Sequence, residues 1–176
     1  MMSRIWVADT CAILDVRRSV VPSDARQAHS ARRQVFKRLE ELVDAGRFVF
    51  PHETYNELKE GNEHVDDATQ DHPFHFVERC KKTALRVANL AIVKELGAHT
   101  LVRRVVDPHA EKDEADIYVL SVAVELQRAG NAVGVLTQER KDHAMKLSMN
   151  TACGLLGLVC LPMSAFLHQE DIWTWR

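Results

Sequence analysis

Short apolar runs with the length of β-strands alternate along the chain with longer amphipathic segments. The strand-like runs are residues 4–8, 47–50, 132–136 and 158–161. The amphipathic segments repeat apolar residues about every 3.6 positions, which predicts helices with one buried face. They are residues 10–16, 28–45, 51–59, 76–96, 112–128 and 141–156, with a last helix beginning at Pro162. This alternation predicts an α/β fold, a three-layer α/β/α sandwich around a central, mostly parallel sheet.

The segments between these elements are interpreted from turn residues and charge. Residues 17–27 and 62–72 are polar and predict loops, the second of them acidic and exposed. Residues 100–106 are rich in β-branched side chains and are compatible with a further strand. The sequence contains no internal repeat and no linker of biased composition, so residues 1–176 are expected to form a single domain.

Residues 147–167 contain no formally charged side chain, and the segment is long enough to span a bilayer. Gly154, Gly157 and Pro162 divide it into short pieces. It is therefore predicted to be a buried helix–strand–helix unit, and no association with a membrane is expected.

The overall composition narrows the class of protein. Hydrophobic residues make up 46% of the 176 positions and charged residues 27%, which excludes a disordered chain. With 23 Lys and Arg against 25 Asp and Glu, the formal net charge of −2 excludes a wholly basic nucleic-acid coat. The 4 cysteines form no C-x-x-C pair, and the first residues contain no apolar signal segment, so a cytoplasmic location is expected.

Four acids occupy positions where a functional group is expected. Asp9 directly follows the first predicted strand, and Glu139 lies just beyond the strand at 132–136. Glu57 lies on the helix after the second strand, and Asp116 lies on a helix that is otherwise mostly apolar. Functional groups of α/β proteins gather at the carboxyl ends of the strands. Acids that meet there repel one another, and a divalent cation relieves that repulsion.

Each acid also has a simpler interpretation. An Asp after a strand often caps the next helix, and a Glu at the position of Glu139 can start a turn. Glu57 can be a solvated helix residue, and its spacing does not distinguish it from Glu53 and Glu60 on the same helix. The acids at 113, 114 and 116 can be first-turn acids favoured by the helix dipole. The joint placement of the four acids, rather than any one of them, favours a shared site.

Five segments, in chain order, carry a resemblance to a known family. They are VADTCAIL at 7–14, PHETYNEL at 51–58, DIYVLSVA at 116–123, VLTQE at 135–139 and ACGLLGLVCL at 152–161. Together they resemble the PIN-domain family of metal-dependent ribonucleases, which includes VapC-type toxins. Glu139 stands where the family more often has Asp, a feature shared with a little-characterised PIN-like subgroup. Residues 62–106 contain no motif that aligns with the family.

The resemblance implies an activity and a set of site residues. Asp9, Glu57, Asp116 and Glu139 would bind Mg²⁺ or Mn²⁺, and a metal-activated water would hydrolyse an RNA phosphodiester bond. Thr137 or Thr10 would position a ligand or the water through its hydroxyl. The implied partners are an RNA substrate, an antitoxin protein if the chain is the toxin of a type II toxin–antitoxin pair, and a second copy in a homodimer. The alternative function is a catalytically weak PIN-like module that binds RNA or protein.

Other candidate chemistry is less well supported by the sequence. Paired basic residues such as those at 32–33 and 37–38 are interpreted as solvated helix faces, whereas Arg140 and Lys141 are expected to lie closer to a bound phosphate. Cys11 is interpreted as a small packing residue rather than a nucleophile.

Overall fold

The computed structural model describes residues 3–61, 71–106 and 114–174, and the strands within them form one parallel five-stranded sheet. Its order is β3-β2-β1-β4-β5, with β1 (Ile5–Ala8), β2 (Phe48–Pro51), β3 (Leu85–Arg86), β4 (Val133–Leu136) and β5 (Val159–Leu161). The α-helices are α1 (Thr10–Ser19), α2 (Ala28–Asp44), α3 (His52–Gly61), α4 (Pro73–Ala84), α5 (Leu90–Ala98), α6 (Asp116–Arg128), α7 (Met149–Leu155) and α8 (Met163–Gln169). Two 3₁₀ helices, η1 (Ala25–Gln27) and η2 (Val102–Val105), complete the described elements.

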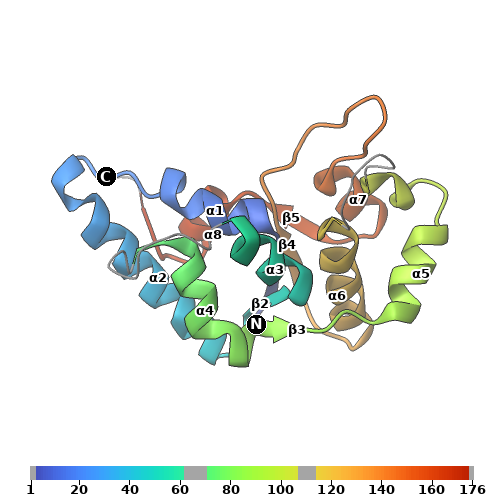
Figure 1. The fold of residues 1–176 in the computed structure, drawn as a ribbon, viewed down its shortest axis with the longest axis horizontal. Coiled ribbons are helices and arrows are strands. Elements are labelled where there is room, and N and C mark those ends of the chain that lie inside the picture. The colour runs from blue at the N-terminus through green and yellow to red at the C-terminus, as the bar shows by residue number, and fades with distance from the viewer. Residues whose placement is uncertain (1–2, 62–70, 107–113, 175–176) are drawn as a thin grey trace.

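Helices cover both faces of the sheet, so the predicted three-layer α/β/α sandwich is confirmed (Figure 1). Successive side chains of a strand point to opposite faces. Trp6 and Ala8 of β1 pack in one hydrophobic cluster with α1, α2, α4 and α8. Val7, between them, packs in a second cluster with α5, α6 and α7. Because the strands are buried on both faces, they appear in the sequence as continuous apolar runs rather than as alternating ones.

A glycine in β4 makes room for the largest side chain of the core. Gly134 pairs with Trp6 across the β1–β4 ladder, and a Cβ atom at position 134 would lie 2.3 Å from the Trp6 ring. Trp6 is fully buried, and its ring packs against Phe166 at a centroid distance of 5.3 Å. The packing on both sides leaves the indole little freedom to move away.

The substitution Gly134→Ala is therefore expected to lower the free energy of unfolding by about 2 kcal/mol, as overpacking of a core does. Chemical denaturation of the purified protein measures the change. Gly154→Ala is the matched control, because a Cβ atom there meets nothing within 4 Å and the residue lies inside α7. Equal stability of the Gly134→Ala variant and the natural protein would contradict the packing argument.

The helix predicted at residues 76–96 is wrong as a single element. The structure divides it into α4 and α5, with the short strand β3 between them. Leu85 and Arg86 leave the helical path to pair with the end of β2, and the side chain of Asn89 then caps α5 by accepting a hydrogen bond from Ala91 N at 3.0 Å. The apolar spacing continues through the break because both helices bury one face, and this continuity concealed the strand.

Two further predictions are corrected in the second half of the chain. Residues 100–106 are not a strand: η2 forms there, and the His99 ring accepts hydrogen bonds from the backbone N–H groups of Leu101 and Val102. The helix predicted at 141–156 begins only at Met149, because the Ser148 side chain caps α7 by accepting a hydrogen bond from Thr151 N at 3.2 Å. The residues before Ser148 form an irregular loop instead.

The N-terminal half departs from the predicted loops in two places. Helix α1 continues to Ser19, beyond the predicted end at Val16. Of the loop predicted at 62–72, residues 62–70 lie outside the described part of the chain, and the last two are buried rather than exposed. Asp71 accepts hydrogen bonds at 2.9 Å from the Arg32 guanidinium and from the His29 ring, which join this segment to α2.

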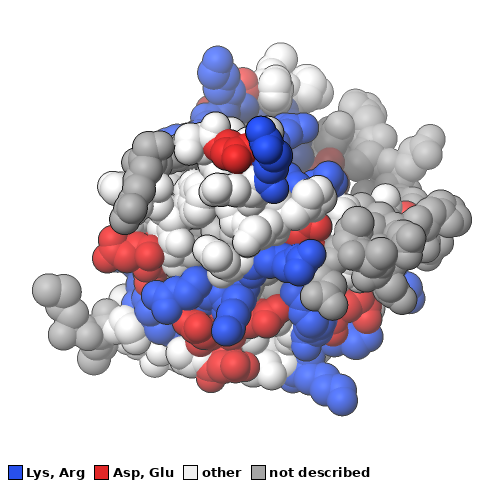
Figure 2. Space-filling model, turned by 90° about the vertical axis from the view of Figure 1, so that its left-hand side faces the viewer, with Lys and Arg blue, Asp and Glu red and all other residues white. Residues whose placement is uncertain are grey.

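The uncharged segment at 147–167 folds into the predicted helix, strand and helix, α7, β5 and α8. It is not buried throughout, because β5 is an edge strand of the sheet and its Val159 is 38% exposed. No helix in the described ranges combines the length and apolar character needed to cross a bilayer. The face at the left of Figure 1, where α2 lies, carries Lys and Arg interspersed with Asp and Glu (Figure 2). Arg38 and Arg79 form ion pairs with Glu41 and Glu40, so the interpretation as a solvated face holds for the pair at 37–38. It is wrong for Arg32, whose side chain is only 15% exposed and pairs with the buried Asp71.

Candidate functional site

The site lies where the order of the sheet reverses. From β1 the chain moves to β2 on one side of the sheet and later returns to β4 on the other side. Such a reversal opens a crevice at the carboxyl ends of the two central strands. Asp9 directly follows β1, and its backbone N–H extends the ladder by donating to Leu136 O of β4 at 3.0 Å. Thr137 follows β4 in the same way, so the sheet itself brings these two residues together.

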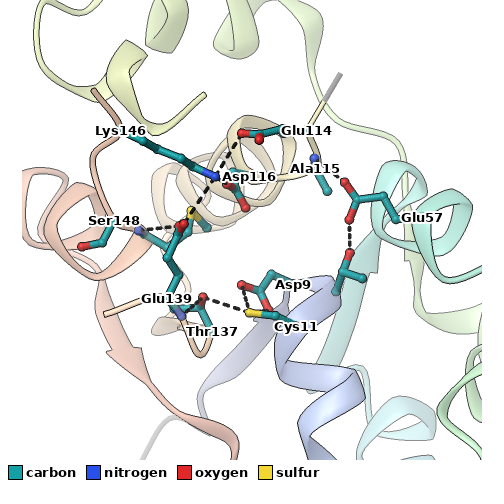
Figure 3. Close-up of polar contacts among 12 residues, drawn as sticks. Asp9, Cys11, Glu57, Glu114, Ala115, Asp116, Thr137, Glu139, Lys146 and Ser148 are labelled. Carbon is teal, nitrogen blue, oxygen red and sulfur yellow. Dashed lines mark hydrogen bonds and ion pairs between the residues drawn. The ribbon is translucent and has the colours of Figure 1, made fainter. Parts of the chain in front are cut away.

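A cavity of about 500 Å³ opens at this crevice (Figure 3). Its charged lining consists of five carboxylates and one ammonium group. The residues that line it are Asp9, Thr10, Cys11, Leu14, Glu57, Glu114, Asp116, Gln138, Glu139 and Lys146. The structure thus brings the four acids singled out in the sequence to one cavity, although they lie up to 130 residues apart in the chain.

Asp9 is a buried acid of the site. Its side chain is 3% exposed and caps α1 by accepting a hydrogen bond from Ala12 N at 2.7 Å. Asp9 can therefore cap α1 and serve as a functional residue at the same time. Burial raises the pKa of Asp9 to about 6, although hydrogen bonds from Thr137, Ala12 and Cys11 oppose the rise. Because ionisation of this buried carboxylate costs free energy, a nearby cation would stabilise its charged form.

Thr137 and Cys11 surround the Asp9 carboxylate. Thr137 is fully buried, and its hydroxyl accepts a hydrogen bond from Glu139 N at 3.0 Å and donates one to Asp9. Thr137 thus positions two of the acids. Cys11 lies with its sulfur 3.1 Å from an Asp9 oxygen. Burial and the charge of Asp9 raise the pKa of Cys11 to about 12, which leaves the thiol protonated and agrees with a packing role.

Glu57 reaches the site from α3 and connects two other helices. It accepts hydrogen bonds from the Thr10 hydroxyl, at the start of α1, and from the backbone N–H of Ala115, at 2.9 Å, just before α6. Both oxygens of its carboxylate therefore have protein partners. Glu57 holds the N-termini of α1 and α6 beside the cavity, which is not the solvated surface position that its helix suggested.

Asp116 and Glu139 face each other through an ammonium group. Lys146 Nζ lies 2.9 Å from Asp116 Oδ2, 3.3 Å from Glu139 Oε1 and 3.1 Å from Glu114 Oε2. Burial raises the pKa of Asp116 to about 7, while its hydrogen bond to Lys146 and the lysine charge oppose the rise. Burial alone would lower the pKa of Lys146, but its bonds to Asp116 and Glu114 raise it above the ordinary value.

The donor set suits a divalent cation of the magnesium type. Mg²⁺ and Mn²⁺ prefer hard oxygen ligands, and often use few carboxylates with several waters. Asp9, Asp116 and Glu139 supply such oxygens in a cavity with room for waters. In the described part of the chain, however, no three His, Cys, Asp or Glu side chains lie close enough together to form a ready-made metal cluster. Lys146 occupies the space between two of the acids.

Lys146 and Glu114 are the charged groups of the site that sequence reasoning missed. Glu114 was considered only as a first-turn acid, and Lys146 fell within a predicted helix with nothing to set it apart. The cap at Ser148 was the one available signal, because it places Lys146 in a loop rather than on a helix. Arg140 and Lys141, which were expected to approach a phosphate, are exposed and are not part of the cavity lining.

Fold and site together define an α/β protein with an acidic cavity at the topological switch of a parallel sheet. A comparison with protein families matches residues 7–174 to the domain of unknown function DUF4411, and the chain belongs to this family. A comparison with curated proteins gives no match. The description of the family names no activity, so the likeness to PIN-domain ribonucleases stays a proposal.

Proposed function

We propose that the chain is a metal-dependent endoribonuclease that uses Mg²⁺ or Mn²⁺. The observation that carries the proposal is the meeting of Asp9, Glu57, Asp116 and Glu139 at one cavity, each delivered by a different part of the sandwich. Keeping so many carboxylates together opposes folding, as the raised pKa values of Asp9 and Asp116 indicate. Such an arrangement is typical of sites that carry out chemistry.

The residues of the chain have distinct roles in this proposal. Asp9, Asp116 and Glu139 would hold the cation, which when bound activates water and stabilises negative charge on a phosphate. Thr137 fixes Asp9 and Glu139 relative to each other through its hydroxyl. Glu57 is included among the ligands on the family resemblance. Its two hydrogen bonds also give it a second role, holding the helices that frame the site.

A second cavity beside the first supports a substrate longer than one nucleotide. It has a volume of about 310 Å³ and shares Cys11, Leu14 and Gln138 with the acidic cavity. Its own charged residues are Asp15 and Arg18, and Arg18 supplies a positive charge beyond the acidic cluster. A guanidinium in a cavity that adjoins the acidic one suits a neighbouring phosphate of a nucleic-acid strand.

The test is cleavage of labelled single-stranded and structured RNAs with Mg²⁺, with Mn²⁺ and with EDTA. Cleavage is expected with either metal and not with EDTA. The Asp9→Asn variant, purified in parallel, is expected to be inactive, which excludes a contaminating nuclease. Metal-independent cleavage, or equal cleavage by the variant, would contradict the proposal.

The alternative is a binding module without catalysis, and one observation favours it. Lys146 already balances part of the charge of Asp116 and Glu139, so the site is partly neutralised without a metal. Under this alternative the protein would bind RNA or a protein partner in the presence of EDTA, and no RNA would be cleaved. The toxin role, the antitoxin partner, the homodimer and the cytoplasmic location stay predictions from the sequence.

A further inference from the structure

Lys146 reaches the acidic cluster from the irregular loop between β4 and α7. Its side chain is only 20% exposed, and its ammonium group contacts Glu114, Asp116 and Glu139 at 2.9–3.3 Å (Figure 3). The preceding residue, Met145, is 62% exposed. The loop therefore turns Lys146 inward while its neighbour faces the solvent.

Backbone contacts in the second half of the loop hold Lys146 in this place. Leu147 N donates to Arg104 O of η2 at 2.7 Å, and Leu147 itself is buried. Ser148 N donates to Asp142 Oδ1 at 2.8 Å, and His143 N donates to Lys146 O at 2.8 Å. The backbone on either side of Lys146 is thus fixed, whereas the long side chain retains rotatable bonds through which it can change position.

The ammonium group of Lys146 reduces the repulsion between these carboxylates, as a metal ion would. Two acids that face each other repel, and a cation between them removes the repulsion. Lys146 supplies that cation to Asp116 and Glu139, the same two acids that the proposed function assigns to a metal. Within the described residues no three His, Cys, Asp or Glu side chains are arranged to hold a metal ion, whereas three carboxylates surround the ammonium of Lys146.

We propose that Lys146 is a tethered counter-ion bound in the place of a divalent cation between Asp116 and Glu139, and that a metal ion must displace it in order to bind. Glu114 gives the displaced ammonium a remaining partner, since it contacts Lys146 from the side of the cluster away from Glu139 and is not one of the assigned metal ligands. The site then changes from lysine-bound to metal-bound without an unpaired buried charge. The proposal rests on the proposed function for the divalent cation and for the two acids that bind it.

The first test measures Mn²⁺ binding by titration calorimetry without RNA. Lys146→Met is expected to bind Mn²⁺ more tightly than the natural protein, by about tenfold or more, because the competitor is gone. Lys146→Arg keeps the charge and is expected to bind no more tightly than the natural protein. Lys141→Met is the matched control: it removes an exposed lysine of the same loop that is not on the cluster, and little change is expected.

The second test observes the displacement in the natural protein. Acetic anhydride modifies exposed lysines, and mass spectrometry of the peptide with Lys146 measures its reactivity. Low reactivity is expected with EDTA, because the ammonium is enclosed by three carboxylates, and at least a severalfold rise is expected at saturating Mn²⁺. Lys141 should react equally in both conditions. This test needs no variant, so it stands even if Lys146→Met fails to fold.

The outcomes separate this inference from the proposed function. Unchanged Lys146 reactivity when Mn²⁺ binds, or equal affinity of the natural protein and Lys146→Met, overturns the displacement while leaving the nuclease proposal intact. Displacement of Lys146 by Mn²⁺ without cleavage of any RNA supports the inference and overturns the nuclease. Absence of Mn²⁺ binding by the natural protein and by folded Lys146→Met overturns both.

Discussion

Asp116→Asn is expected to reduce metal-dependent RNA cleavage by about a thousandfold, whereas Glu57→Gln is expected to reduce it only about tenfold. Asp116 begins α6 and directs its carboxylate into the cavity, where it pairs with the ammonium of Lys146. Asn keeps the shape of the side chain but removes the charge that a divalent cation needs. Losing a ligand of this kind costs about 4 kcal/mol of transition-state stabilisation, which corresponds to the thousandfold loss.

Glu57 differs because both of its oxygens already accept hydrogen bonds from the protein. Gln keeps one oxygen acceptor, so the contact with Ala115 or with Thr10 can survive. The helices that frame the cavity are then only loosened, which explains the smaller expected loss. The difference between the two variants would separate a residue that holds the cation from one that holds the site together.

Single-turnover cleavage at saturating metal measures both losses, and thermal unfolding shows that both variants are folded. Glu41→Gln is the control, since Glu41 lies on α2, is about half exposed and pairs with Arg38 on the surface. It is expected to cleave at the natural rate. If Glu57→Gln is as inactive as Asp116→Asn, the assignment of Glu57 mainly to a framing role is wrong.

Asp9→Asn is expected to raise the free energy of unfolding by about 3 kcal/mol near neutral pH in EDTA. Burial raises the pKa of Asp9 from its ordinary value of 3.8 to about 6, so the folded state binds a proton more tightly than the unfolded state. Stability therefore falls as the pH rises from about 4 to about 6, and the full cost is present above that range. Asn removes the ionisation but can still cap α1, because Asn and Asp are equally good caps.

Urea denaturation at about pH 4 and at about pH 8 measures this effect, and the gain is expected at the higher pH and largely absent at the lower one. Asp24→Asn is the matched control, as Asp24 caps η1 through its side chain but lies on the surface. It is expected to change the stability little at either pH. A gain in stability of Asp9→Asn that is equal at both pH values would show that ionisation of Asp9 is not its cause.

Removing a carboxylate from this cluster is thus expected to reduce RNA cleavage in one variant and to increase the stability of the fold in the other. The carboxylates that the proposed chemistry needs are those that oppose folding in the absence of a cation. Saturating Mn²⁺ would then stabilise the natural protein but not Asp9→Asn, since a ligand that binds the folded state alone shifts the unfolding equilibrium.

The layers of the fold could be predicted from the amino-acid sequence alone. Strands buried on both faces need continuous apolar runs, and the helices that cover them need one apolar face, so both leave a local pattern. The same local reasoning placed Asp9 and Glu139 beyond the ends of strands, where they are found. It failed at Leu85, because the helical spacing of apolar residues continues from α4 through β3 into α5 and conceals the strand.

The contacts of each acid could not be predicted without the packed structure. The partners of Glu57 lie 47 and 58 residues away in the chain, and no local pattern records them. Lys146 depends on a loop fixed by η2 and by the cap of α7, elements that the sequence had predicted as a strand and a longer helix. Periodicity reports which face of an element is buried, whereas contacts between charges depend on how distant elements pack, and that is settled only when the sheet assembles.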